Sequence, residues 1–117
     1  MFAGTSGGTE KPISFADFQK LDIRVGKILF AEPVAGSSKL IKLRVDLGGD
    51  ERTIVAGIAA EYSPEELAGK SIAVLANVES KTLMGIESQG MILAADVRGK
   101  AVLLHPGKSA PAGSQIK

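Results

Sequence analysis

The chain has 117 residues and a net charge of +1, with 44% hydrophobic, 23% charged and 4% aromatic residues, no cysteine and one histidine. This length fits one domain and is short for two, and the lack of cysteine excludes disulfides and thiolate metal sites. Because non-specific nucleic-acid binders carry a much larger positive excess, nucleic-acid binding would need a local basic patch, or patches joined in an oligomer.

The start of the chain has no targeting or membrane pattern. No apolar run approaches the roughly 20 residues that cross a bilayer, and the first residues lack the basic-then-apolar order of a signal peptide. We therefore predict a cytoplasmic protein that does not bind membranes. Residues 1–12 are rich in Gly, Thr and Ser and are expected to form a flexible tail or linker, and residues 13–117 to form one domain.

The first predicted elements are a short helix and a strand. Ser14 opens the sequence SFAD, which resembles a capping box and predicts a helix over Phe15–Lys20. Apolar residues gather in Ile23–Phe30, which predicts a strand, and Gly26 inside it predicts a bulge or sharp bend. Residues 32–38, EPVAGSS, have the composition of a turn.

The clearest periodicity lies in Leu40–Leu47, where apolar and charged residues alternate. Alternation of this kind is typical of a half-buried strand. One face carries Ile41, Leu43, Val45 and Leu47, and the other carries Lys42, Arg44 and Asp46. Residues 48–51, GGDE, predict a hairpin turn, and Thr53–Ala56 continue as the next strand.

The second half of the chain contributes one helix and three strands. Ser63 and Pro64 begin the sequence SPEE, a strong helix start, and Gly69 predicts the end of that helix. Residues 71–78 predict a buried strand, residues 91–97 and 101–104 the last strand pair, and the tail an irregular segment. Three strands, a short helix and two strands, here followed by the short strand of residues 101–104, are the order of an OB-fold, an all-β, five-stranded Greek-key barrel that commonly binds oligonucleotides. The short N-terminal helix is an addition.

The candidates for catalysis are few. His105 is the single histidine, so a catalytic triad or a His-based metal site is excluded. Glu65 and Glu66 are adjacent, diverge on a helix, and are explained by capping. No phosphate-binding or dinucleotide motif is present. We predict a binding module with no catalytic residue, metal or cofactor.

The densest basic window is Ser37–Val45, which holds no acidic residue. A solvated strand face would explain it, but its position favours binding. In an OB-fold the ligand meets strands two and three between two rim loops. The candidate phosphate contacts on these elements are Lys39, Lys42, Arg44 and Lys81.

The second rim loop adds polar and apolar candidates. Asn77 and Ser88 can bond to sugar or phosphate, although Asn77 also suits a turn at a strand end. Met91 suits either the core or an adaptable contact. The phenylalanines Phe15, Phe18 and Phe30 are expected in the core. Without exposed rings, single-strand binding by stacking is disfavoured, and phosphate and shape recognition of a folded RNA fits better.

Several dispersed segments carry a family resemblance: FADFQKLDIRVGKI, GSSKLIKLRVDLG, ERTIVAGIA, YSPEELAGK and GIESQGMILAA. Because these segments occur in this order over about residues 13–116, the chain resembles the tRNA-binding domain family. That family includes a free bacterial tRNA-binding protein and the C-terminal domain of many methionyl-tRNA synthetases. The resemblance implies an OB-fold homodimer that binds the outer corner of tRNA in protein biosynthesis, without catalysis.

Carried onto this chain, the resemblance assigns Lys39 to the loop lysine, Asn77 to the asparagine that opens the recognition loop, and Ser88 and Met91 to the S-x-G-M motif. One segment departs from the family. Relatives commonly have a proline and several basic residues after the asparagine, whereas this chain reads NVESKT, with only Lys81 basic. Each phosphate contact that is missing should weaken binding and lower the salt dependence.

Three alternatives stay open from the sequence. The chain is a free protein, or a domain that joins a synthetase catalytic domain in the same or another chain. Some members of this family act as secretion chaperones, so a peptide-binding dimer is the first rival function. A purely structural dimerisation domain is the second.

Overall fold

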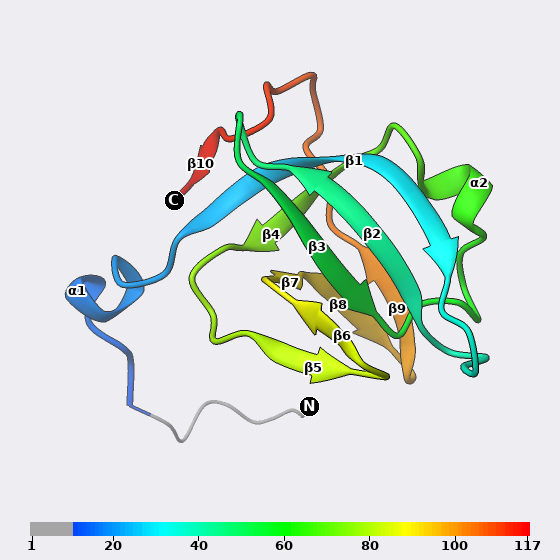
Figure 1. Cartoon of the computed structure of the whole chain (residues 1–117). Helices are drawn as coiled ribbons and strands as arrows, with labels where there is room; N and C mark the ends of the chain where they lie inside the picture. The colour runs from blue at the N-terminus through cyan, green and yellow to red at the C-terminus, as the bar shows by residue number, and fades with distance from the viewer. Residues whose placement is uncertain (1–10) are drawn as a thin grey trace.

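The structure, a computed structural model, describes residues 11–117 as a β-barrel with two short helices (Figure 1). The elements are α1 (Phe15–Phe18), β1 (Ile23–Pro33), β2 (Ile41–Asp46), β3 (Glu51–Ala56), α2 (Pro64–Leu67), β4 (Ser71–Leu75), β5 (Lys81–Leu83), β6 (Ile86–Ser88), β7 (Met91–Ile92), β8 (Ala94–Val97), β9 (Lys100–Leu103) and β10 (Gln115–Ile116). The predicted all-β, OB-like class is confirmed. Most of the predicted tail lies outside the described residues. Within residues 11–117, no helix is long and apolar enough to cross a bilayer.

Strand β1 joins the two halves of the barrel. The main sheet runs in the order β3-β2-β1-β4-β7, with β10 also paired to β1. The first half of β1 pairs with β4, from Ile23 opposite Leu75 to Lys27 opposite Ser71. Its second half pairs with β2, from Lys27 opposite Asp46 onward. Because its two halves pair with different strands, β1 curves from one side of the barrel to the other (Figure 1).

Gly26 sits where this curvature brings β1 against the core. A Cβ atom at Gly26 would lie 2.6 Å from Cγ1 of Val45, and 3.0 Å from side-chain carbons of Leu47 and Val74. Only a residue without a side chain therefore fits at this point of β1.

Replacing Gly26 by alanine is expected to lower the free energy of unfolding by about 1–3 kcal/mol, because the added methyl group overpacks the core. Urea denaturation measures the change. Gly57→Ala is the matched control, since a Cβ there meets nothing closer than Leu40 Cδ2 at 4.0 Å. Equal losses in the two variants would contradict the packing explanation.

The alternation predicted for the second strand is confirmed. Ile41, Leu43 and Val45 are at most 1% exposed, whereas Lys42 and Arg44 are partly exposed on the other side of β2. The buried side joins a core of aliphatic residues from β1, β3, β4 and α2. The other side, shared by β1, β2 and β3, is called the outer face below.

The prediction that Phe30 lies in the core is wrong, because a bulge reverses its direction. The register between β1 and β2 shifts between Ile28 and Phe30. Phe30 therefore lies opposite Arg44 and Ala31 opposite Leu43, so Phe30 joins the outer face with 48% of its surface exposed. An uninterrupted alternation from the buried Ile28 would have placed Phe30 inside.

The same prediction is wrong for the N-terminal helix. The helix α1 stands away from the barrel in Figure 1 and has no buried residue. Phe15 is 71% exposed, and its ring stacks on that of Phe18 at a centroid distance of 6.5 Å. The hydroxyl of Ser14 accepts from the N–H of Asp17, as predicted. The helix ends at Phe18, two residues before the predicted end.

Other differences concern the second half. The expected loop between Val78 and Gly90 contains a hairpin, β5–β6. The strand predicted over residues 91–97 is divided at Leu93 into β7 and β8. The tail, expected to be irregular, adds β10 beside the start of β1. The capping box at Ser63 is confirmed, with both reciprocal bonds to Glu66.

Candidate nucleic-acid interface

The outer face is bordered by two rims that touch. The first rim is the loop of residues 34–40, and the second is the segment of residues 78–90 with the β5–β6 hairpin. A Cβ atom at Gly36 in the first rim would lie 3.2 Å from Cε of Met84 at the hairpin turn. The structure thus brings together two elements that are far apart in the sequence.

The predicted strand cations lie on the outer face, but each has an acidic neighbour. Nζ of Lys42 lies 3.5 Å from a carboxylate oxygen of Glu32. Nε of Arg44 lies 3.4 Å from a carboxylate oxygen of Glu51, and Nη1 donates to the Thr53 hydroxyl at 3.0 Å. Because such half-exposed pairs contribute only about 0–1 kcal/mol, a phosphate could replace either carboxylate.

The two rim lysines differ from the strand cations. Lys39 and Lys81 are both exposed, and neither has a carboxylate oxygen within 4.0 Å of its ammonium in residues 11–117. Among the four predicted cations, Lys39 and Lys81 can therefore bind an anion without first breaking an ion pair.

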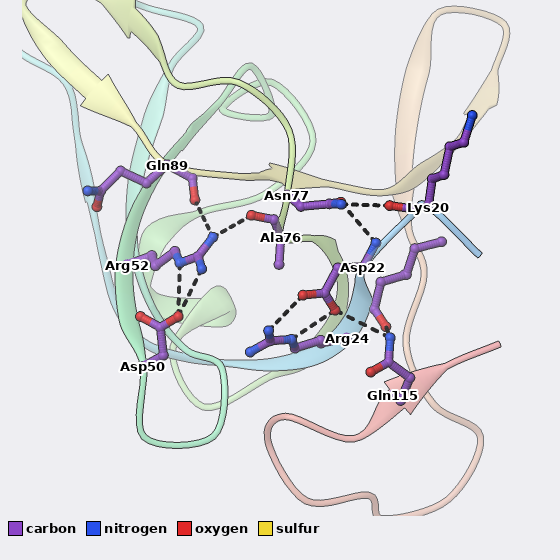
Figure 2. A network of polar contacts seen from close by, with 10 residues as sticks. Lys20, Asp22, Arg24, Asp50, Arg52, Ala76, Asn77, Gln89 and Gln115 are labelled. Carbon is purple, nitrogen blue, oxygen red and sulfur yellow. Dashed lines mark hydrogen bonds and ion pairs between the residues drawn. The ribbon is translucent and has the colours of Figure 1, made fainter. Parts of the chain in front are cut away.

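Asn77 is exposed, but its side chain is engaged in holding the start of the second rim. Its side-chain oxygen accepts from the N–H of Asp22 at 2.9 Å, and its side-chain nitrogen donates to the carbonyl of Lys20 at 2.7 Å (Figure 2). Both ends of the amide are thus used to tie the chain before β1 to the end of β4. A direct bond from Asn77 to sugar or phosphate would require these contacts to break.

Ser88, in contrast to Asn77, is buried. It is 4% exposed, and its hydroxyl accepts from the N–H of Val55 at 2.9 Å while donating to the carbonyl of Gly90 at 3.2 Å. This position fixes β6 against the edge of β3. Met91, in contrast, is 45% exposed and remains available as an apolar contact.

Sequence reasoning missed Arg52, which supports the second rim from below. From β3 its guanidinium donates to the carbonyl of Ala76 and, at 3.3 Å, to that of Gln89 (Figure 2). On the other side of the guanidinium, Nη2 of Arg52 lies 2.9 Å from a carboxylate oxygen of Asp50. One side chain thus joins both ends of the segment between β4 and β7. Nothing in the local sequence distinguishes Arg52 from its exposed neighbours.

A second ion pair fixes the start of β1. Nη2 of Arg24 lies 2.6 Å from Asp22, whose carboxylate also accepts from Gln115 on β10. The hydrogen bond from Arg24 lowers the pKa of Asp22. A lowered folded-state pKa means that the carboxylate stabilises the fold above about pH 4, and that this contribution is lost as the pH falls further.

The remaining candidate chemistry is sparse. His105 is exposed, with Nδ1 3.1 Å from the carbonyl oxygen of Pro106. Within the described part of the chain, no three His, Cys, Asp or Glu side chains are placed to share a metal ion. The features that the structure does assemble are a face with cations, an exposed ring at Phe30, and two rims, of which the second is held by Arg52, Asn77 and Ser88.

Known proteins show the same fold and sequence pattern. Residues 23–115 match the family described as "Putative tRNA binding domain". The methionine–tRNA ligase of Archaeoglobus fulgidus is 55% identical over 107 residues, which cover 92% of this chain and 16% of the ligase. The corresponding ligase of Flavobacterium johnsoniae is 50% identical, over 89% of this chain and 15% of the ligase. The chain thus spans about a sixth of these relatives.

Two solved structures extend the comparison. A MetRS-related protein from Pyrococcus horikoshii has a TM-score of 0.87 and 38% identity, covering 92% of this chain and all of that protein. The chaperone CsaA of Bacillus anthracis has a TM-score of 0.82 and 31% identity, with coverage of 92% and 100%.

Proposed function

The chain belongs to the tRNA-binding domain family, and from that premise we propose that it is a non-catalytic module that recognises the folded shape of tRNA. It binds the outer corner of tRNA as a homodimer in the cytoplasm. It acts as a free protein or as the C-terminal domain of a methionyl-tRNA synthetase. The similarity to short segments of methionine–tRNA ligases supports the second arrangement.

The observation that carries this proposal is the pair of unneutralised lysines on two touching rims. Lys39 and Lys81 border a face on which Lys42 and Arg44 have only weak surface pairs to exchange. Contacts to phosphates from fixed positions recognise the shape of a folded RNA and carry no base sequence. In this arrangement Asn77 and Ser88 position the second rim from within, and Met91 adds an apolar contact.

The small number of available cations is a further reason to expect selectivity for a folded RNA. A groove that grips any single strand combines a continuous basic track with several stacked rings. On the outer face the exposed ring is Phe30, and most charges are balanced. A flexible single strand would lose conformational entropy when it is ordered against the same few cations, so its binding should be weaker.

This selectivity is tested by competition. Labelled folded tRNA is displaced with unlabelled tRNA, or with an unstructured RNA of equal length, at low salt. We expect the unstructured RNA to compete at least about tenfold less well, a difference of about 1.4 kcal/mol. Equal competition would contradict recognition of shape.

The detached helix α1 supports the homodimer. The exposed Phe15, stacked on the half-buried Phe18 of a helix with no buried residue, leaves apolar area in water that a second copy can cover. Two copies would also double the number of rim lysines available to one RNA.

Replacing Phe15 and Phe18 by serine is therefore expected to shift the protein from dimer to monomer, without loss of the barrel. Sedimentation equilibrium measures the mass, and thermal unfolding checks the fold. Replacing the exposed Val97 and Val102 of the β8–β9 hairpin by serine is the matched control. A dimer that persists in the Phe15/Phe18 variant would place the interface elsewhere.

A peptide-binding chaperone is the second candidate function. The similarity to CsaA favours it, as do the exposed methionines Met84 and Met91 beside the outer face, since methionine suits adaptable binding surfaces. A protein that suppresses aggregation of an unfolded polypeptide, but has no affinity for tRNA, would fit this function. A stable dimer with neither activity would be a structural module.

A further inference from the structure

An apolar recess opens on the outer face beneath the second rim. It has a volume of about 330 Å³, and its lining includes Val55, Gly57, Leu83, Met91 and Ile92. Val55 lies opposite Lys42 in the β2–β3 register and so belongs to the outer face, yet it is only 7% exposed. The β5–β6 hairpin therefore covers part of that face and leaves a sheltered space.

One lysine lines this recess, and two more lie on elements beside it. Lys81 lies in its lining, and Lys42 is the cross-strand neighbour of Val55 at its floor. The carbonyl of Lys39 accepts from the N–H of Ala59, the residue after Ile58 in the wall. Glu79 is the acidic residue of the lining. Lys42 has only a half-exposed pair with Glu32 to give up. An apolar interior with these lysines at its border is therefore complementary to a ligand that is flat and apolar in the middle and anionic at its two ends.

We propose that this recess holds one unstacked nucleobase of the folded RNA, with the phosphates on its two sides near Lys81 and the Lys39–Lys42 border. The inference rests on the proposed function and adds the part of the RNA that enters the protein. A nucleotide drawn out of its stack presents a flat heterocycle between two phosphates, and pockets for such bases commonly enclose them between apolar or aromatic side chains.

The size of the recess favours a base over a peptide. Small-molecule sites range from about 300 to 1,000 Å³, so this recess is at the lower end and suits a single ring system. An extended peptide would need a series of pockets along a strand edge, and a cationic border would add nothing to an apolar side chain. The recess also explains how a face with little exposed aromatic surface can hold a base.

Gly57 offers a way to fill the recess without strain. It has an ordinary backbone conformation, and a Cβ atom there would meet nothing closer than 4.0 Å. Gly57→Leu is expected to weaken binding of folded tRNA about tenfold, since the base and the leucine compete for one space. Ala94 on β8 also lines the recess, so Ala94→Leu is a second filling variant that can be used if Gly57→Leu does not fold.

The matched control is Gly107→Leu. Gly107 also has an ordinary conformation and open space around it, and it lines a separate cavity of about 590 Å³ beside α2 that shares no residue with the recess. Dimethyl sulfate probing of bound tRNA supplies a second readout. We expect one or two bases to change reactivity with the wild type and Gly107→Leu, and to stay unchanged with the two recess variants.

The outcomes separate this inference from the proposed function. Wild-type protein that does not bind tRNA overturns both. Wild-type protein that binds tRNA, with recess variants of equal affinity and an equal reactivity pattern, overturns the recess alone. Recess variants that keep tRNA affinity but lose binding of a reduced, carboxymethylated polypeptide would assign the recess to peptides and also overturn the inference.

Discussion

Replacing Lys39 and Lys81 together by glutamate is expected to weaken binding of folded tRNA about 100-fold, or about tenfold for each lysine. Both side chains are exposed, and neither has a carboxylate within 4.0 Å in residues 11–117, so the substitution breaks no ion pair of the folded protein. Each reversal removes a cation that pairs with a phosphate and places an anion against the RNA backbone. The slope of log K against log salt should fall by about one for each phosphate that is no longer neutralised.

The control for this variant has the same change in net charge. Lys70 and Lys108 line the cavity beside α2, away from the recess and its rims. Their joint replacement by glutamate should reduce tRNA affinity by no more than about threefold, through the general field of the protein. If the two double variants weaken binding equally, affinity depends on net charge and not on the rims.

Replacing Arg52 by methionine is expected to lower the free energy of unfolding by about 2–3 kcal/mol. The guanidinium satisfies the carbonyl of Ala76, a residue only 4% exposed, and methionine would leave that acceptor without its donor. The same change releases the segment between β4 and β7 from β3. Chemical denaturation measures the stability, and amide exchange in residues 78–90 should become faster.

Arg44→Met is the matched comparison for the Arg52 variant. Arg44 is also an arginine on a neighbouring strand, but its partners are the exposed Glu51 and the half-buried Thr53. Its replacement should change stability by less than about 1 kcal/mol while reducing tRNA affinity, because methionine cannot pair with a phosphate. Equal losses of stability in the two variants would contradict the assignment of Arg52 as the support of the second rim.

The sequence predicts the barrel well because its signals are local. The alternation in β2 sets which side of that strand is buried, and the Ser63 capping box sets the start of α2. The order of the elements then leaves few ways to bring strands two and three between two rims. Lys39, Lys42, Arg44 and Lys81 could be placed on that surface from their positions in these elements.

The errors arise where one tertiary contact overrides a local pattern. A single extra residue in β1 turns Phe30 outward, whereas Gly26, where a bulge or bend was predicted, lies in regular register with Ile72 of β4. Phe15 lies on a helix that does not touch the barrel core, so its apolar character does not predict burial within the chain. The roles of Asn77 and Arg52 depend on carbonyl groups distant in sequence, which a pattern of neighbours cannot reveal.

The central claim is that a few fixed cations recognise a folded RNA, and the salt dependence of tRNA binding by the unmodified protein tests it most directly. Folded tRNA would be titrated at four salt concentrations between about 50 and 200 mM. We predict a slope of about −2 to −4 for each protomer, from the two rim lysines and the two strand cations that exchange partners. Binding that does not change with salt, or no binding at the lowest salt, would contradict this claim.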